Sequence, residues 1–434
     1  MAEIVPFKAF RYDPHQVKLE DVLTQPYDKI TPEMQSRYYD LSAHNLVRII
    51  LGKAFETDSD KFNVYTRAAE YLHDWRSGGI LKQDQEPSIY LYVQTFTVPG
   101  TRNLAERRGL IALGRLHDYS EGVVFRHEQT LAKPRQDRLN LLRATRAHFG
   151  QIFMLYSDPQ AEVERTLEKQ TEEDPDLSVL DEYEVMHRVW RIHEPTLVGK
   201  VQELMKEKKL LIADGHHRYE TALAYRDERR SRSEGSDRNA AYEFVMMTLV
   251  RMESPGLVIL PTHRVVHGLP TFDRERMLES AKRFFDIDRI DLRTESRSAT
   301  TLLEEAGAGG TSFVAVTRQG PYLLRAKKRI VQDALSFIPS DQRELDVIQL
   351  HKLLLERILG ISEEAIRNQD HVKYERDAFE AISWVRQGAN VAFLMNPARI
   401  EQVSGVAFGG QVLPQKSTDF YPKLLSGLTL YVLE

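Results

Sequence analysis

A turn at residues 214–218 gathers the side chains best suited to chemistry. Residues 210–222 read Leu-Leu-Ile-Ala-Asp-Gly-His-His-Arg-Tyr-Glu-Thr-Ala, so an apolar run ends at a polar turn before a helix-like segment begins. The first N–H groups of a helix lack partners within it, and with the helix dipole they attract anions. The turn adds a carboxylate, two imidazoles and a forked guanidinium, from Asp214, His216, His217 and Arg218. These groups predict phosphate chemistry.

The same turn has a structural interpretation and a metal-binding one. Asp214 could cap the helix while Gly215 supplies a positive φ. One carboxylate and two imidazoles also suit a divalent ion, but adjacent histidines in a turn seldom point at the same ion. We therefore favour Mg²⁺ that arrives on a nucleotide and is held by Asp214 and phosphate oxygens.

A second candidate site is the segment Arg126-His127-Glu128-Gln129-Thr130, which lies between an apolar strand and a basic helix. A carboxylate beside an imidazole can act as a general base toward a hydroxyl, so Glu128 and His127 are candidate catalytic residues. The alternative is a carboxylate that caps the helix on a solvated loop. Arg138 in that helix is a candidate phosphate ligand.

Two further segments carry weaker signals. The run Leu260-Pro261-Thr262-His263-Arg264 ends an apolar strand with an imidazole and a cation, which either contact a substrate or simply close the strand. Lys416, Ser417 and Thr418, followed by Lys423, resemble an anion-binding loop. That loop lacks the glycines of a Walker motif.

Alternating helical and strand patterns predict a mixed α/β (α+β) fold that positions these residues. Expected strands cover 4–10, 45–51, 89–96, 108–116, 151–156, 183–192, 244–250, 312–317, 320–325, 391–395 and 428–433. Expected helices cover 60–75, 135–147, 200–207, 273–285 and 346–359. The acidic stretch 161–181 is expected to be a solvated loop. The domain hypothesis is an N-terminal region over 1–105, a core over 106–255 and a C-terminal region over 256–434.

Composition narrows the classes of function. The 434 residues are 42% hydrophobic and 28% charged, which is ordinary for a globular protein of two or three domains. A net charge of -5 disfavours broad nucleic-acid binding, which usually needs a basic face. The absence of cysteine excludes thiolate catalysis and disulfides. Without an apolar membrane span or signal-like start, we expect a cytoplasmic protein with no membrane partner.

The ordered motifs resemble a widespread bacterial and archaeal family of domains of unknown function. The motifs that carry the resemblance are His127-Glu128-Gln129-Thr130, Lys133-Pro134, Asp137-Arg138-Leu139, Ile152-Phe153, Ala213 to Ala222, Pro414 to Thr418 and Phe420 to Lys423. Several motifs recurring in order over nearly the whole chain are more specific than any one of them.

The Asp-Gly-His-His-Arg turn also resembles the phosphate-binding turn of the ParB and sulfiredoxin superfamily, which includes kinases of free L-serine. That resemblance implies a ParB/sulfiredoxin-like nucleotide-binding core. It implies Glu128 as the base toward the serine hydroxyl, and residues 214–218 as ligands of phosphate and metal. In those kinases a proline precedes the histidine of this motif, whereas in this sequence Arg126 precedes His127.

The resulting hypothesis is a kinase that uses ATP or ADP with Mg²⁺ to phosphorylate free L-serine. Sulfiredoxin-type repair is disfavoured because it relies on a cysteine, and ParB-type DNA clamping is disfavoured by the acidic balance. The alternative is a nucleotide-binding or hydrolysing switch that has protein partners and no small-molecule acceptor. The preferred donor and the assembly into a homo-oligomer stay open.

Overall fold

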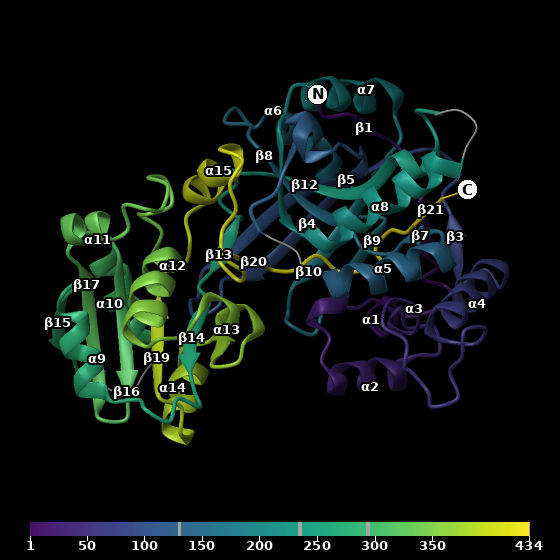
Figure 1. The fold of residues 1–434 in the computed structure, drawn as a ribbon. Helices are drawn as coiled ribbons and strands as arrows, with labels where there is room; N and C mark the ends of the chain where they lie inside the picture. The colour runs from purple at the N-terminus through teal and green to yellow at the C-terminus, as the bar shows by residue number, and fades with distance from the viewer. Residues whose placement is uncertain (129–131, 233–236, 292–295, 434) are drawn as a thin grey trace. The chain divides into compact units, whose positions relative to one another are not determined.

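The computed structural model describes residues 1–128, 132–232, 237–291 and 296–433, excluding the side chains of 132–134 and 296–298. The chain divides into two compact units (Figure 1). Unit 1 comprises 1–126, 130–258 and 422–434, and unit 2 comprises 127–129 and 259–421. The chain passes from unit 1 into unit 2 after residue 258, and unit 1 includes both residues 105 and 106. A single strand, β5 (Leu104–Arg115), runs across that position.

Unit 1 is built on a mixed sheet with the strand order β6-β11-β8-β12-β5-β4-β10-β9, and β1 also pairs with β5. Its other strands are β1 (Ile4–Val5), β4 (Ile89–Thr97), β6 (Val124–Phe125), β8 (Ile152–Tyr156), β9 (Leu177–Leu180), β10 (Met186–Ile192), β11 (Leu210–Asp214) and β12 (Phe244–Arg251). The strands expected over 89–96 and 108–116 are present as β4 and β5, which pair in antiparallel register as a hairpin. The mixed α/β class is confirmed.

Helices and short strands of unit 1 surround this sheet. The helices are α1 (Leu19–Val22), α2 (Pro32–Leu41), α3 (Val47–Ile50), α4 (Val64–Ser77), α5 (Ala132–Thr145), α6 (Glu162–Leu167), α7 (Pro195–Lys206) and α8 (His216–Arg232), with 3-10 turns at Tyr27–Lys29, Tyr119–Glu121, Glu168–Glu172 and Ala241–Glu243. Strand β2 (Phe10–Tyr12) pairs with β3 (Leu81–Gln83), and β7 (Ala147–His148) pairs with β21 (Tyr431–Val432). Helices α5 and α8 lie side by side, joined by Leu139, Leu142 and Tyr225 (Figure 1).

Four segments of unit 1 differ from the sequence predictions. The strand expected over 4–10 is limited to β1 at Ile4–Val5, and β2 begins only at Phe10. The apolar run expected as a strand over 45–51 is helix α3, because the Asn45 side chain accepts the backbone N–H of Val47 and starts a helical turn. The expected loop over 161–181 contains helix α6 and strand β9. Helix α6 buries apolar side chains four residues apart, and β9 buries every second side chain. The strand expected over 428–433 is only two residues of β21. Short apolar runs do not distinguish helix from strand by periodicity alone.

Unit 2 contains an antiparallel sheet with the order β15-β17-β16-β19-β14-β18. These strands are β14 (His263–Val266), β15 (Phe285–Arg289), β16 (Ser312–Thr317), β17 (Gly320–Ala326), β18 (Val372–Glu375) and β19 (Val391–Met395). The chain enters this unit within β13 (Val258–Leu260) and leaves it after β20 (Asp419–Tyr421).

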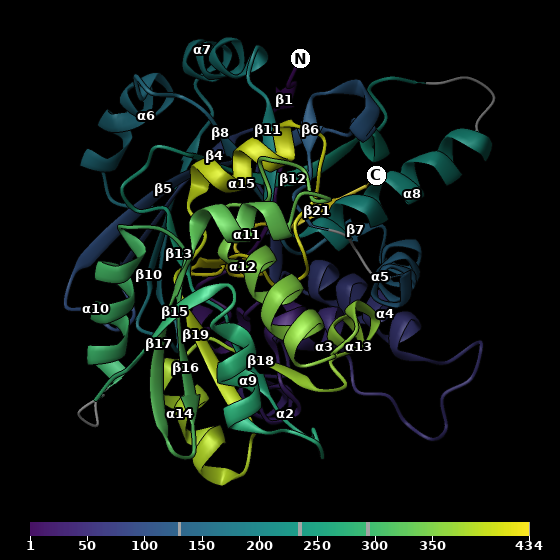
Figure 2. The same ribbon diagram turned by 60° about the vertical axis from the view of Figure 1, so that its left-hand side comes forward.

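Helices cover the sheet of unit 2. They are α9 (Arg274–Ala281), α10 (Ser296–Gly307), α11 (Lys328–Ala334), α12 (Asp346–Gln349), a π-helix (Leu350–Ile358), α13 (Glu363–Asn368), α14 (Ala378–Gln387) and α15 (Ile400–Phe408). Helices α10 and α14 pack on one face of the sheet, where Leu303 and Val385 join a core with Val314 and Leu394 (Figure 2). The region expected to form a single helix over 346–359 consists of α12, a short α-helical turn, which continues as the π-helix.

A glycine beside the hairpin yields a stability prediction. A Cβ at Gly256 would overlap the backbone carbonyl of Glu106, so Gly256→Ala forces the backbone apart. We expect Gly256→Ala to lower the free energy of unfolding by about 1–3 kcal/mol, as overpacking does. The matched variant Gly199→Ala in helix α7 meets no atom within 4 Å and should raise it by about 0.5–1 kcal/mol. Urea denaturation of both variants measures the change in the free energy of unfolding. Equal changes in the two variants would contradict this prediction.

Candidate phosphate and acceptor sites

The Asp-Gly-His-His-Arg turn joins a buried strand to a long helix in unit 1, as predicted. Strand β11 ends at Asp214 after a register shift against β8, and helix α8 begins at His216. Gly215 between them has φ +93°, a conformation that side-chain-bearing residues rarely adopt. The first intrahelical bond runs from the Tyr219 N–H to the Gly215 carbonyl at 3.0 Å. The preceding N–H groups are those that point toward the turn.

The carboxylate of Asp214 lies among cations. Arg218 Nη2 donates to Asp214 Oδ2 at 2.9 Å, and Lys423 Nζ lies 3.5 Å from Oδ1. Burial favours the neutral form of Asp214, but the charges of Lys423, Arg218 and Lys29 outweigh it and hold the pKa of this carboxyl well below its ordinary value. The sum of these charges is positive, so the turn can accept an additional anion.

A buried arginine contributes to the same positive field. Arg107 of β5 is 1% exposed, donates to Gln94 Oε1 at 3.0 Å and stacks 4.6 Å from the centre of the Phe153 ring. Burial lowers its pKa to about 10, while the nearby charge of Asp214 acts in the opposite direction. At neutral pH this guanidinium is therefore still charged.

Arg138 and Arg218 line one small cavity of unit 1, of about 70 Å³. Arg138 donates to the Ile50 carbonyl at 2.6 Å and lies 4.1 Å from the centre of the Tyr27 ring. Arg218 also donates to the backbone carbonyl of Gln151. These contacts hold both guanidinium groups in place, and rigid forks of this kind suit phosphate recognition.

Glu128 belongs to unit 2, where it lies against the loop that carries Lys416. Its Oε1 accepts the backbone N–H of Lys416 at 3.3 Å, and its backbone forms a parallel bridge with Leu413. His127 is 1% exposed, and its Nε2 lies 2.8 Å from Thr418 Oγ1. Gln129 and Thr130 lie outside the described residues, as do the side chains of 133 and 134.

Arg264 lies in the same part of unit 2. It is 1% exposed, donates to the Lys416 carbonyl at 3.0 Å and lies 4.9 Å from the centre of the Tyr374 ring. Its Nε lies 3.3 Å from His351 Nε2, on the π-helix, a geometry that occurs often at functional sites. Burial lowers the pKa of Arg264 to about 10, while the charge of Glu128 favours its protonated form. A carboxylate and a guanidinium thus share one region of unit 2.

The remaining predicted site residues contact groups close to their own segments. His263 is buried, and its Nδ1 accepts the Met395 N–H at 3.3 Å. Burial and the charge of Arg264 lower the pKa of His263 to about 4, so its imidazole is neutral at neutral pH. Ser417 donates to the Pro414 carbonyl at 2.5 Å. His216 is buried and His217 is half-buried in the first turn of α8. Among the described residues, no cluster of three or more histidine, aspartate or glutamate side chains could hold a metal ion.

Sequence reasoning missed Lys29 and Arg107, and it noted Lys423 only as part of a basic loop. The available signal for Arg107 was an arginine pair just before the apolar run 110–113. Lys29 and Lys423 lie far from the turn in sequence, so only the fold brings their charges to Asp214.

The chain belongs to the family described as "Protein of unknown function (DUF1015)", whose model matches residues 4–348. The predicted family membership is therefore confirmed. No curated protein sequence matches the chain significantly. No helix among the described residues is long and apolar enough to cross a membrane.

The solved structures that the chain matches include a free serine kinase. A variant of that kinase in complex with ADP is 12% identical, with a TM-score of 0.35 over 70% of this chain and 89% of its own. A conserved hypothetical protein from Pyrococcus furiosus is 12% identical, with a TM-score of 0.33 over 70% of this chain and 91% of its own. C-terminally truncated SbnI from Staphylococcus aureus is 9% identical, with a TM-score of 0.37 over 74% and 87%.

The geometry of the turn predicts that Gly215 matters for anion binding beyond its backbone conformation. A Cβ at Gly215 would lie 3.1 Å from the guanidinium of Arg218, so Gly215→Ala both strains the turn and displaces that group. We expect Gly215→Ala to weaken pyrophosphate binding at least about tenfold, which corresponds to ~1.4 kcal/mol. Isothermal titration calorimetry with pyrophosphate measures this loss.

The matched control is Gly122→Ala, because Gly122 also has positive φ (+66°) but a Cβ there meets no atom within 4 Å. Both variants should lose about 1–2 kcal/mol of stability from the strained backbone, while only Gly215→Ala loses affinity. Equal pyrophosphate affinities in the two variants would show that Arg218 and its turn do not bind phosphate.

Proposed function

We propose that this chain is a small-molecule kinase that transfers a phosphoryl group from ATP or ADP to free L-serine, giving O-phosphoserine. The observation that carries the proposal is the surplus of positive charge around Asp214 at the start of α8. Lys29, Arg218 and Lys423 surround one carboxylate there. A helix N-terminus with excess cations favours a polyphosphate chain.

Glu128 is assigned as the general base. In the proposed reaction the serine hydroxyl oxygen forms a bond to the terminal phosphorus of the nucleotide. The bond between that phosphorus and the bridging oxygen breaks, and Glu128 takes the hydroxyl proton. The carboxylate is half-buried, and its Oε1 accepts the backbone N–H of Lys416 at 3.3 Å. A carboxylate has several acceptor sites, so it can also accept a substrate hydroxyl.

Arg264 is assigned to the serine carboxylate. Its guanidinium is buried and lies close enough to Glu128 for the two charges to interact. Charge-assisted hydrogen bonds from a buried, held arginine are strong and geometrically specific. His263 is neutral and accepts a backbone N–H, so its proposed role is to pack beside Arg264 rather than to pair with an anion.

The absence of a Cβ at Gly215, which would lie 3.1 Å from the guanidinium of Arg218, supports a phosphate site at the turn. The proposed phosphate ligands are residues 214–218, Arg138 and the loop 416–418. Magnesium is expected to arrive on the nucleotide. Asp214 is its proposed protein ligand and is already paired with two cations, so we assign no catalytic step to the metal.

Phosphorus NMR tests the reaction directly. Purified protein with Mg²⁺, ATP or ADP, and L-serine should generate an O-phosphoserine signal. We expect Glu128→Gln to slow its formation by about 10²–10⁴-fold, the usual contribution of a general base, while ADP affinity stays within a factor of about two. Glycerate, threonine and homoserine serve as competing acceptors.

Glu364→Gln on the exposed face of α13 is the matched control and should leave the rate unchanged. An unchanged rate in Glu128→Gln would remove the base assignment. Nucleotide binding or hydrolysis without any phosphorylated acceptor would instead favour the nucleotide-dependent switch.

A further inference from the structure

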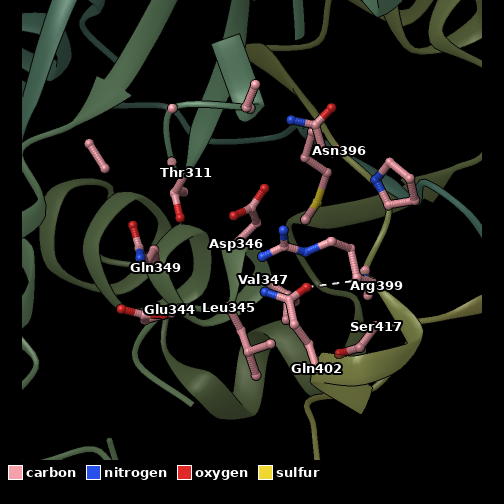
Figure 3. A pocket seen from close by; sticks show the side chains of 18 of the residues that line it. Thr311, Glu344, Leu345, Asp346, Val347, Gln349, Asn396, Arg399, Gln402 and Ser417 are labelled. Carbon is pink, nitrogen blue, oxygen red and sulfur yellow. Dashed lines mark hydrogen bonds between the residues drawn. The ribbon is translucent and has the colours of Figure 1, made fainter. Parts of the chain in front are cut away.

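Unit 2 contains a cavity of about 580 Å³, and among the residues assigned to the proposed reaction only Ser417 lines it (Figure 3). Its walls come from the end of α10, the start of α12 and the segment that leads into α15. Neither Glu128 nor Arg264 lines it. The volume lies within the usual range for small-molecule sites.

A carboxylate faces this cavity without a cation in contact. Asp346, at the start of α12, forms no ion pair among the residues that the structure describes. Burial raises the pKa of Asp346 to about 6, although the hydroxyl of Thr311 and the charge of Arg399 act to lower it. Removing water from a carboxylate without pairing it is costly.

A guanidinium lies on another wall of the same cavity. Arg399 precedes helix α15, and its side chain extends into the cavity (Figure 3). Its charge reaches Asp346, yet no ion pair forms between the two groups. Within the described parts of unit 2, a negative and a positive group therefore face one cavity without neutralising each other.

A buried amide adds hydrogen-bonding capacity. Gln349 lines the cavity, is 6% exposed and donates through Nε2 to the Arg343 carbonyl at 2.8 Å. Its Oε1 is buried and has no hydrogen-bond partner among the described residues. Buried carbonyl oxygens are normally satisfied, so an N–H donor supplied by a ligand would complete this group.

We propose that this cavity binds a small zwitterion, whose ammonium pairs with Asp346 and whose carboxylate pairs with Arg399. A ligand with only an ammonium would face Arg399 unfavourably, and one with only a carboxylate would face Asp346. A free amino acid and a short peptide share the required chemistry. This site goes beyond the proposed kinase function, since its residues are separate from Glu128 and Arg264.

Calorimetric titrations of the full chain with matched probes test the charge requirement. L-norleucine carries both charges, whereas hexanoate and pentylamine carry one each. Triglycine, N-acetyltriglycine and triglycine amide form the corresponding peptide series. None of these probes carries a hydroxyl, so none can act as a phosphoryl acceptor. Substitutions of Asp346 and Arg399, which lie outside the proposed acceptor site, decide whether a probe binds in this cavity.

We expect either L-norleucine or triglycine to bind at least tenfold more tightly than its two single-charge analogues. Asp346→Asn and Arg399→Gln should each weaken that binding at least tenfold, and Arg399→Lys should restore part of it. Glu364→Gln should bind as the unchanged protein does, and circular dichroism checks that every variant is folded. The series that binds more tightly shows whether the natural ligand is a free amino acid or a short peptide.

Three results would overturn the proposal. They are binding of neither zwitterion, equal binding of a zwitterion and its single-charge analogues, and full affinity in both Asp346→Asn and Arg399→Gln. If one variant fails to fold, the affinity of the other variant still decides the outcome.

Discussion

The position of the Asp214 carboxylate is the constraint on which the first unit's site depends. A strand ends in a charged group that is partly removed from water, so that charge needs cations nearby. Arg218 comes from the same turn, and its fork closes back on Asp214 because positive φ at Gly215 reverses the chain. The guanidinium is thereby held before any ligand arrives. A positive, preorganised helix start follows from that arrangement.

The C-terminal segment completes this environment. Residues 422–434 return to unit 1, where Lys423 pairs with Asp214 and its carbonyl accepts the Gln94 side chain at 2.9 Å. Strand β21 then pairs with β7. Conversely, His127 and Glu128 belong by their contacts to unit 2, although their neighbours in sequence belong to unit 1. Each unit therefore contains site residues from a segment that is distant in sequence from the rest of that unit.

Much of the fold was predictable from pattern, and the errors have a physical explanation. The expected strands β4 and β5, the helix α4 and the β11–α8 junction are confirmed. In such long segments with clear periodicity, burial of a whole face dominates the energetics. The run 45–51 is too short for periodicity to decide, and the Asn45 side chain supplies the helix start. Acidic composition concealed α6 and β9, whose few apolar residues are nevertheless buried.

The sequence by itself determined the strand–turn–helix at 210–222 and the absence of thiol chemistry, because both depend on local residue order or composition. Family membership also followed from motifs in order. Only the tertiary structure decided which charges surround Asp214, that Glu128 and Arg264 share one region of unit 2, and that Asp346 and Arg399 face one cavity. Electrostatic neighbours are set by distances in space, and strand pairing and chain return bring together groups that no local pattern relates.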